Sequence, residues 1–401
     1  MSEIIYRLYG LIHYLSKRIL GKQSISASPS LWRSLSSRCS KIGYQELSNL
    51  WYSFIVNSEI LSIPEYAGFH YAGYIKENQR WCLASWIWTN AALVRMYCNI
   101  GEIDKAEQIC QLFIGRQEKN GGWIVRNDYD ERGPIPMLAP NDSAYIANNA
   151  FISLYLHTQD YKYLEVAKKC ADWIMKVVRP DGIVYTGYNM RDKEWIQKNV
   201  IVDIGFTAGL FAKMYEITHE EKYKSFLSKF IDRYIQLFYS SSYCGFCTSI
   251  DENNKPQGGM FARGQAWALE GLIPAYIVLK EQKIRTVIET VIDKLITSQT
   301  KHGSWSYNLT RKLMGEDCKA VSVIAKNLME WYQITSDQRI RDSAYKALCW
   351  CYNHTMTEGE SKGGIFSFCV EGAIVHNLYT SCAFVYASAY AIELKQMLCD
   401  E

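Results

Sequence analysis

Residues 303–305, Gly-Ser-Trp, form one of five short glycine turns that recur along the 401-residue chain about every sixty residues. The other four are Gly122-Trp123, Asp181-Gly182-Ile183-Val184, Gly245-Phe246 and Gly364-Ile365-Phe366. Recurrence at a nearly constant interval indicates that one supersecondary unit is repeated along the chain. Apolar residues follow helical spacing between the turns, so we interpret each unit as a pair of helices.

Two kinds of helix alternate in this repeat. Residues 223–238 carry apolar side chains along one stripe, which is typical of an amphipathic outer helix. Residues 144–156 and 379–394 are apolar nearly all round, and a helix without a polar face must be enclosed by other elements. The sequence predicts six enclosed helices, which begin near Trp81, Asp142, Asp203, Arg263, 317–320 and Tyr379.

Six enclosed helices ringed by six amphipathic ones predict an all-α (α/α)6 toroid, or six-hairpin barrel. The first outer helix is expected around residues 38–58, beside a last inner helix at 379–395. No run of alternating β-branched residues is long enough to predict a sheet. A closed ring cannot be cut into independent halves, so we expect one catalytic domain over residues 38–401.

Residues 1–37 are expected to precede the toroid as an amphipathic helix and a linker. Residues 4–20 place apolar side chains on one helical stripe with basic residues between them, and residues 21–37 are rich in serine. The stripe lacks the continuous apolar core of a signal peptide. It is expected to pack on the toroid or a partner, or alternatively to bind a membrane surface.

The composition narrows the classes of function. A net charge of +3 without a dense basic run argues against nucleic-acid binding. No apolar run reaches the roughly 18 residues of a transmembrane helix. Thirteen cysteines without a secretory signal favour a reducing, cytoplasmic compartment. The pair Cys244 and Cys247 has a redox or zinc spacing, but no second pair completes a zinc site.

Two aspartates occupy equivalent positions at the starts of successive enclosed helices. Asp142 and Asp203 lie 61 residues apart, and neighbouring helices pack at roughly 8–10 Å, so both side chains are expected to face one substrate. Asp203 lies within the apolar sequence 200–206, which predicts a carboxyl shielded from water. Either aspartate is alternatively a plain helix N-cap.

The next enclosed helix opens with Arg263-Gly264-Gln265-Ala266-Trp267. An arginine fork suits a substrate carboxylate, and an aromatic face suits a sugar ring. The alternatives are that Arg263 pairs with a structural aspartate, that Gln265 caps a helix, and that Trp267 is ordinary core.

These residues carry a family resemblance. The block 260–272, with its Arg-Gly-Gln-Ala-Trp sequence, resembles the unsaturated glucuronyl hydrolases and the related unsaturated rhamnogalacturonyl hydrolases of the six-hairpin glycosidase superfamily. Residues 201–223 are similar to the family's Ile-Asp-containing inner helix. Trp81 and Trp86 resemble its first inner helix. The likeness covers roughly residues 75–335, and the Arg-Gly-Gln-Ala-Trp block is its most specific element.

The resemblance implies a hydrolase of oligosaccharides that carry a 4,5-unsaturated uronic acid at the non-reducing end. It implies that Asp203 is the general acid/base and that Asp142 is a second essential carboxylate. We expect substrate contacts from Trp81, Asn141, Arg263, Gln265 and Trp267. Protonation at C4 and addition of water at C5 of the vinyl ether need no metal or organic cofactor.

The sequence departs from the family at two places. The family often has a histidine where this chain has Asn141, and residues 248–262 lack an expected histidine. His70 and His376 are possible spatial substitutes. Two other functions stay open, namely a sugar epimerase or polysaccharide-biosynthesis enzyme, and a non-catalytic toroid that binds glycan or protein.

Overall fold

The computed structural model describes residues 44–75, 79–83, 86–130, 133–197, 200–310, 316–368 and 381–399. The predicted N-terminal helix and linker, residues 1–37, lie outside this range. The chain divides into two compact units: unit 1 comprises Met1–Trp86 and Leu295–Glu401, and unit 2 comprises Ile87–Lys294.

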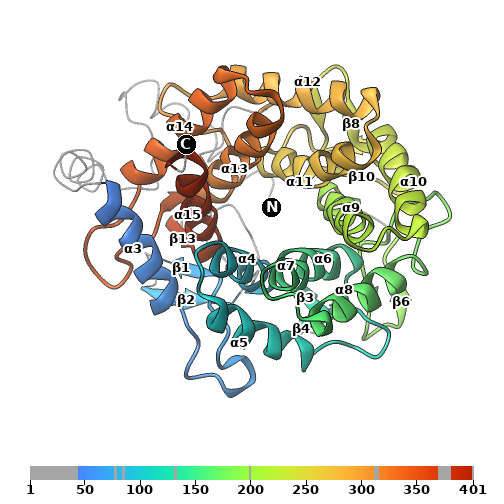
Figure 1. The fold of residues 1–401 in the computed structure, drawn as a ribbon, viewed down its shortest axis with the longest axis horizontal. Helices are drawn as coiled ribbons and strands as arrows, with labels where there is room; N and C mark the ends of the chain where they lie inside the picture. Colours follow the sequence, from blue (N-terminus) through green and yellow to red (C-terminus); the bar gives the residue numbers. More distant parts are fainter. Residues whose placement is uncertain are drawn as a thin grey trace. The chain divides into compact units, whose positions relative to one another are not determined.

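Unit 2 alternates enclosed and amphipathic helices (Figure 1). The enclosed ones are α4 (Trp86–Asn99), the continuous run of α6 (Pro140–Ile146), the π-helix η2 (Ala147–Ile152) and α7 (Ser153–Thr158), the run of the 3₁₀-helix η3 (Val202–Gly205) and α9 (Phe206–Thr218), and α11 (Ala262–Leu279). The amphipathic ones are α5 (Ile103–Ile114), α8 (Tyr161–Ile174), α10 (Glu221–Phe238) and α12 (Gln282–Ser298), whose last residues belong to unit 1.

Unit 1 continues the same alternation. It contains α3 (Tyr44–Asn57), α13 (Cys318–Thr335), α14 (Gln338–Asn353) and α15 (Val385–Cys399), with α15 in contact with α3, α13 and α14. The described residues of both units thus supply six enclosed and six amphipathic helices, which confirms the predicted all-α class. The predicted start at Tyr379 lies outside the described residues.

Burial distinguishes the two kinds of helix as the sequence pattern predicted. Every residue from Ala262 to Leu269 of α11 is buried. By contrast, α10 buries one stripe, which consists of Tyr223, Leu227, Phe230, Ile231, Tyr234, Leu237 and Phe238.

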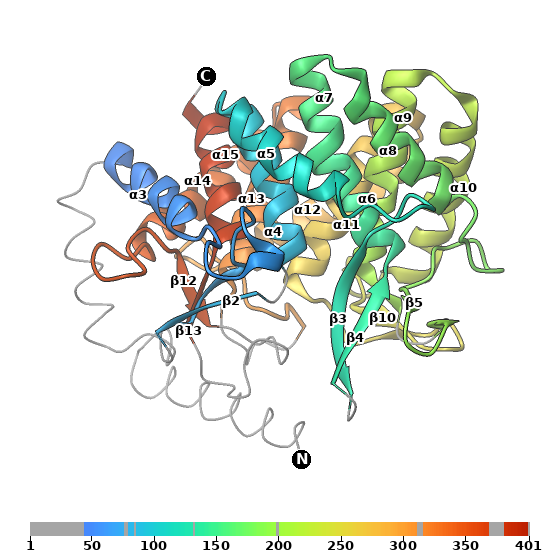
Figure 2. The same cartoon turned by 90° about the horizontal axis from the view of Figure 1, so that it is seen from below.

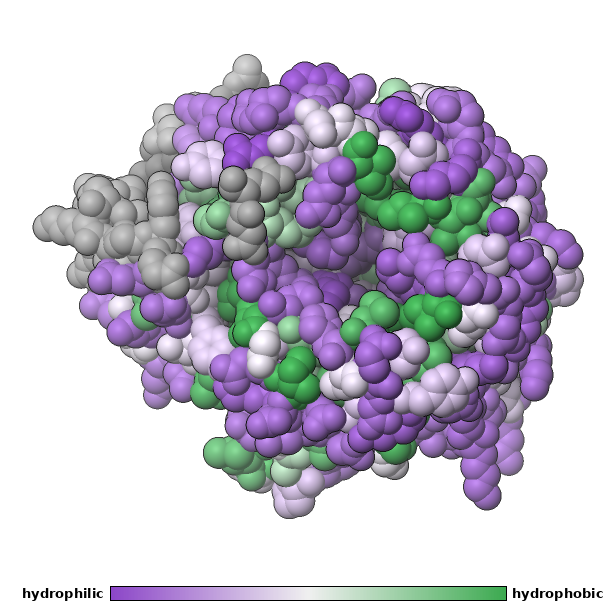
Figure 3. All heavy atoms as spheres, viewed as in Figure 1, coloured by the Kyte–Doolittle hydropathy of each residue, from purple (hydrophilic) through white to green (hydrophobic). Residues whose placement is uncertain are grey.

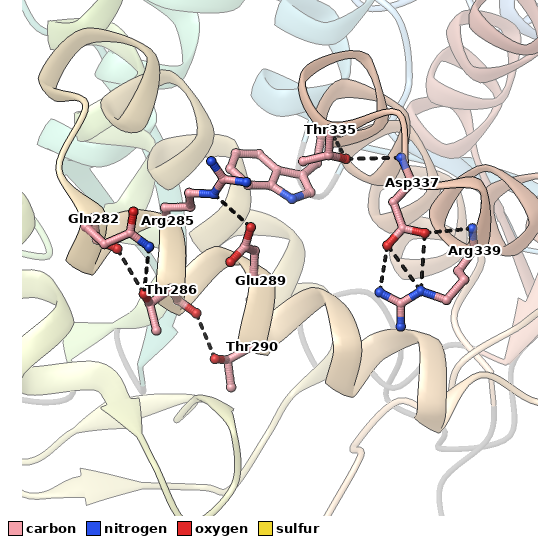
Figure 4. A network of polar contacts seen from close by, with 9 residues as sticks. Gln282, Arg285, Thr286, Glu289, Thr290, Thr335, Asp337 and Arg339 are labelled. Atoms are coloured by element: carbon pink, nitrogen blue, oxygen red, sulfur yellow. Dashed lines mark hydrogen bonds and ion pairs between the residues drawn. The ribbon is translucent and has the colours of Figure 1, made fainter.

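A repeated turn joins an enclosed helix to the amphipathic helix that follows it. The enclosed helix ends at a non-glycine residue in the left-handed region, and these residues are Gln159, His219, Lys280 and Ser336, with φ of 55–56°. The next residue is acidic in each turn. Figure 4 shows one example, in which Asp337 caps α14 and forms an ion pair with Arg339 at 2.6 Å.

Figure 4 also shows the exposed side of α12. There Arg285 Nε donates to Glu289 Oε1 at 2.8 Å, and the Thr290 hydroxyl donates to the carbonyl of Thr286 at 2.7 Å. These contacts join residues one helical turn apart, where side chains are neighbours on the helix surface.

Short antiparallel strands lie in the loops, although the sequence pattern predicted none. The first sheet has the order β12 (Phe366–Phe368), β13 (Ser381–Phe384), β1 (Gly73–Ile75) and β2 (Arg80–Cys82). The second has β3 (Ile124–Asp130), β4 (Gly133–Leu138), β5 (Tyr188–Asn189) and β6 (Glu194–Trp195). The others are β11 (Pro256–Gln257) with β10 (Ser249–Ile250) and β7 (Val200–Ile201), and β8 (Tyr239–Ser240) with β9 (Gly245–Phe246). Most are too short for alternation to be recognised in a sequence.

The hairpin β3–β4 of unit 2 leads directly into α6 and extends beyond the end of that helix (Figure 2). The face seen in Figure 3 is mostly hydrophilic, with hydrophobic residues in separate patches. Within the described residues, no helix has the length and apolar character needed to cross a membrane.

Candidate active site

Asp142 lies in the first turn of α6. Pro140 begins this helix after the extended residue Ala139, because its fixed φ suits the first helical position and its missing N–H is not needed there. The Asp142 side chain is 1% exposed, and its Oδ1 accepts from Trp88 Nε1 at 2.8 Å and from Asn141 Nδ2 at 3.5 Å. Two donors and the positive helix end therefore hold this carboxylate in place.

Asn141 contributes a second polar group beside Asp142. Its side chain is fully buried, and its Oδ1 has no hydrogen-bond partner in the structure. Buried polar atoms are normally paired, and such an exception calls for an explanation. An acceptor next to a carboxylate is suited to a donor on a bound molecule, such as a sugar hydroxyl.

Asp203 lies in η3, immediately after β7, and is 2% exposed. The hydroxyl of Tyr234 on α10 donates to the carbonyl oxygen of Val202 at 2.8 Å. Burial, and to a lesser extent the nearby charge of Asp203, raises the pKa of Tyr234 well above its ordinary value. Tyr234 therefore stays a protonated donor, and it holds the backbone next to Asp203.

The structure brings the first turns of α6 and α9 together. The rings of Tyr145 and Phe206 lie 4.6 Å apart between centroids. Each ring lies three residues after its aspartate, and residues three apart share one side of a helix. The contact therefore places Asp142 and Asp203 on adjacent helix starts within unit 2, as the repeat predicted.

Arg263 on α11 adds a cation to this group. Its side chain is 6% exposed, and its guanidinium carbon lies 4.6 Å from the ring centroid of Trp267 and 5.2 Å from that of Phe261. Trp267 in turn packs against Phe206 at 5.9 Å and Trp88 at 6.3 Å. Aromatic contacts thus connect Arg263 with the η3–α9 run that carries Asp203 and with Trp88 of α4, which donates to Asp142.

Small residues allow η3 and α11 to approach closely enough for this arrangement. A Cβ added to Gly271 would lie 2.2 Å from the carbonyl oxygen of Gly205. A Cβ added to Gly205 would lie 2.8 Å from the Tyr234 hydroxyl oxygen and 3.0 Å from the carbonyl oxygen of Trp267. Only glycine fits at these two contacts without displacement of the backbone.

Gln265, which the sequence predicts as a substrate contact, is hydrogen-bonded to backbone groups. It is fully buried, its Oε1 accepts from the Phe246 amide at 2.7 Å, and its Nε2 donates to the carbonyls of Phe246 and Phe261 at 2.8 and 3.0 Å. Both ends of the amide are therefore engaged by backbone groups, and Gln265 fixes β9 to the start of α11.

Trp81 does not begin an enclosed helix. It lies in β2 of unit 1, opposite Tyr74 of β1, and packs against Phe54 at 5.1 Å between ring centroids. The helix begins five residues later at Trp86. The sequence interpretation missed Trp88, although two tryptophans within three residues at the start of an apolar helix were a usable signal.

His70, a possible substitute for the family histidine, is also structural. Its Nδ1 lies 3.0 Å from both the Ser58 hydroxyl and the Ile55 carbonyl oxygen in unit 1. His376 lies outside the described residues. Among the described residues, no group of three or more histidine, cysteine or acidic side chains is arranged to hold a metal ion.

We compared the sequence and the structure with those of known proteins. Residues 143–339 match the model of glycosyl hydrolase family 76, and no curated protein matches the sequence. The structure is similar to unsaturated glucuronyl hydrolase from Bacillus sp. GL1, with a TM-score of 0.69 and 16% identity over 89% of this chain and 97% of that one.

Two other similar structures have different activities. Cellobiose 2-epimerase from Bacillus thermoamylovorans has a TM-score of 0.66 and 11% identity over 88% of this chain and 98% of that one. A family 76 glycoside hydrolase from a bovine Bacteroides thetaiotaomicron strain has a TM-score of 0.63 and 13% identity over 90% of this chain and 79% of that one. At these identities the likeness shows the fold alone, so the chain has the six-hairpin (α/α)6 toroid fold of these glycosidases and epimerases.

Proposed function

We propose that this protein is a glycoside hydrolase that acts on oligosaccharides with a 4,5-unsaturated uronic acid at the non-reducing end. The observation that carries the proposal is the arrangement of Asp142, Asp203 and Arg263 at three helix starts of unit 2 joined by aromatic contacts. Two carboxylates supply proton transfer and charge stabilisation, and the guanidinium offers a partner for the substrate carboxylate.

We assign the general acid/base role to Asp203. It lies between the fully buried residues Val202 and Ile204, which keep bulk water away from its carboxyl group. The protonated carboxyl donates its proton to C4 of the double bond, and positive charge develops at C5 and the ring oxygen. The resulting carboxylate takes a proton from the water that adds at C5, which regenerates the acid.

The product of this addition is a hemiketal at C5. It opens to a ketone, the ring oxygen becomes a hydroxyl at C1, and the C1 hemiacetal releases the remaining sugar. Asp142 is assigned to orient the sugar and stabilise the developing positive charge, because the Trp88 and Asn141 donors hold its carboxyl group in place. Asn141 Oδ1 is the proposed acceptor for a sugar hydroxyl.

The test is incubation with unsaturated disaccharides from polysaccharide lyases, monitored by loss of the ultraviolet absorbance of the double bond. We expect activity in the wild type, a loss of at least about a hundredfold in Asp203→Asn and Asp142→Asn, and no effect of Asp160→Asn. Asp160 is a matched control because its carboxylate accepts from the Lys162 amide at the start of the outer helix α8. Full activity of Asp203→Asn would rule out the acid role.

A second candidate is hydrolysis of a saturated glycoside, which is favoured by the family 76 match over residues 143–339. This reaction uses two carboxylates at the anomeric carbon. Its substrate has no conjugated double bond, so the reaction causes no loss of ultraviolet absorbance. Release of reducing sugar from saturated glycans without bleaching of unsaturated ones would support this candidate.

An epimerase is less favoured by the site. The structurally similar cellobiose 2-epimerase supports only the fold, and epimerases of this shape are expected to use paired histidines. Within the described residues, the first turns of α6, α9 and α11 contain no histidine.

A further inference from the structure

We propose that three aromatic side chains of unit 2, Tyr185, Tyr188 and Trp195, form a second carbohydrate subsite, called here the aromatic platform. It would bind a pyranose ring farther along the same oligosaccharide whose end is cleaved. The proposal rests on the proposed function for the identity of the sugar chain, and it adds a preference for longer substrates.

The three rings pack together without being fully enclosed. The rings of Tyr185 and Trp195 are stacked, with centroids 4.8 Å apart and an interplanar angle of 25°. Tyr188 meets Trp195 edge-on at 5.2 Å. All three side chains are half-buried, so the cluster keeps aromatic surface in contact with solvent.

The platform is held rigidly by the hairpin β5–β6. Tyr188 and Trp195 are directly opposite each other in this pair of strands. Asn189 closes the turn, because its Oδ1 accepts from the amides of Arg191 and Asp192 at 2.9 and 3.0 Å and its Nδ2 donates to Asp192 Oδ2 at 2.8 Å. A surface that is already ordered loses little conformational entropy when it binds a ligand.

The platform is connected to both candidate catalytic elements. Tyr188 pairs with Leu138 at the end of β4, two residues before α6 begins at Pro140. On the other side, β6 is followed by β7 and then by η3, which carries Asp203. Figure 2 shows β4 and β5 at the end of unit 2 where α6 begins. A sugar chain that extends away from the aspartates therefore has the platform at the same end.

The chemistry of the platform suits a sugar ring. The C–H groups on a pyranose face carry partial positive charge, and an aromatic face is electrically negative, so the two attract each other. The turn beside the platform contributes Arg191 and Lys193 as well as Asp192 and Glu194, which balance in charge. We therefore expect the platform to recognise the ring itself, with little dependence on salt.

The test measures binding and cleavage separately. Isothermal calorimetry with saturated uronic-acid di-, tetra- and hexasaccharides gives Kd as a function of length, and loss of ultraviolet absorbance gives kcat/KM for the unsaturated ones. The variants are Trp195→Ala and the conservative Trp195→Phe. The control is Tyr161→Ala, which removes an aromatic ring that is 57% exposed on α8.

We expect the wild type to bind hexasaccharide about tenfold more tightly than disaccharide. Trp195→Ala is expected to bind hexasaccharide no more tightly than disaccharide, with its disaccharide Kd and its kcat unchanged. Trp195→Phe should retain most of the tighter hexasaccharide binding, and Tyr161→Ala should retain all of it. A gain that persists in Trp195→Ala, or a wild type whose Kd does not vary with length, overturns the platform. Length-dependent binding that requires Trp195, without bleaching of any unsaturated substrate, supports the platform and rejects the proposed function.

Discussion

Trp88 Nε1 donates a 2.8 Å hydrogen bond to Asp142 Oδ1, and this bond links the first turn of α4 to the first turn of α6. The Trp88 ring also packs against Trp267 at 6.3 Å between centroids. Trp88 is therefore a positioning residue, which holds Oδ1 of the Asp142 carboxylate.

Replacement of Trp88 by phenylalanine should lower kcat. The change keeps an aromatic ring but removes a hydrogen bond to a carboxylate, which is worth about 1.5–3 kcal/mol and corresponds to a roughly ten- to hundredfold loss. KM should change little if Asp142 acts mainly on the transition state. Steady-state kinetics on an unsaturated disaccharide checks this, and an unaltered kcat would argue against a positioning role.

Trp123→Phe is the matched control for this variant. Trp123 is also a tryptophan of unit 2, and its Nε1 donates to the Phe113 carbonyl at 2.8 Å. This variant should lose about 1–3 kcal/mol of unfolding free energy in urea and keep its kcat, because the group left unpaired is the Phe113 backbone carbonyl and no candidate catalytic carboxylate loses a donor.

Gly205→Ala should destabilise the start of α9. The new Cβ would meet the Tyr234 hydroxyl oxygen at 2.8 Å and the Trp267 carbonyl oxygen at 3.0 Å, so η3 must shift and carry Asp203 with it. We expect a loss of about 1–3 kcal/mol of unfolding free energy together with reduced activity.

Two further variants test this explanation. Gly115→Ala is the control, because its Cβ would meet nothing closer than 3.7 Å and its φ is −61°. Tyr234→Phe alone removes the hydroxyl that holds the Val202 carbonyl next to Asp203, so it should also lower activity, whereas Gly115→Ala should not. Full activity and normal stability of Gly205→Ala would contradict this explanation.

Gln265→Leu distinguishes a structural role from substrate binding. The change removes three hydrogen bonds and leaves the buried amide and carbonyl of Phe246 unpaired, so the unfolding free energy should fall by about 2–4 kcal/mol. KM of the folded enzyme should stay the same. A large rise in KM with normal stability would restore the original prediction of a substrate contact.

The helical repeat was predictable because it depends on patterns that the whole sequence carries. Glycine turns and wholly apolar segments specify which helices are enclosed, and Asp142, Asp203 and Arg263 indeed lie in the first turns of such helices. The hairpin β3–β4 was not predicted, because two prolines and a bulge interrupt its alternation.

The individual contacts of the site were less predictable than its position. Gln265 lies in the same short block as Arg263 and Trp267, yet it is turned toward the backbone of β9. Trp81 and Trp88 are both tryptophans near a helix start, and only the hairpin β1–β2 assigns the first to a strand. Such choices depend on residues far away in the sequence, which local patterns do not reveal.

His354 should make stability depend on pH below neutrality. Burial lowers its pKa to about 3, its Nδ1 donates to the Trp350 carbonyl at 2.7 Å, and its ring stacks on Trp350 at 3.8 Å. Above pH 6.5 the imidazole is neutral in the folded and unfolded states, so it contributes no pH dependence.

Between pH 6.5 and about 3 the unfolded chain binds a proton that the folded protein does not. The unfolding free energy should therefore fall by up to about 1.4 kcal/mol per pH unit in this window. Denaturant titrations at several pH values should show a shallower decline in His354→Gln than in the wild type. Parallel curves for the two proteins would exclude this residue as the cause.

The thermal stability of the fold can be tested at the four residues in the left-handed region that end enclosed helices. These residues are Gln159, His219, Lys280 and Ser336. A side chain in this conformation is strained, and glycine is the residue that helix ends of this kind prefer. Each turn is local and far from the next along the chain, so gains at separate turns should add. We therefore expect a protein with glycine at these four helix connections to unfold at a higher temperature, with Asp142 and Asp203 left unchanged.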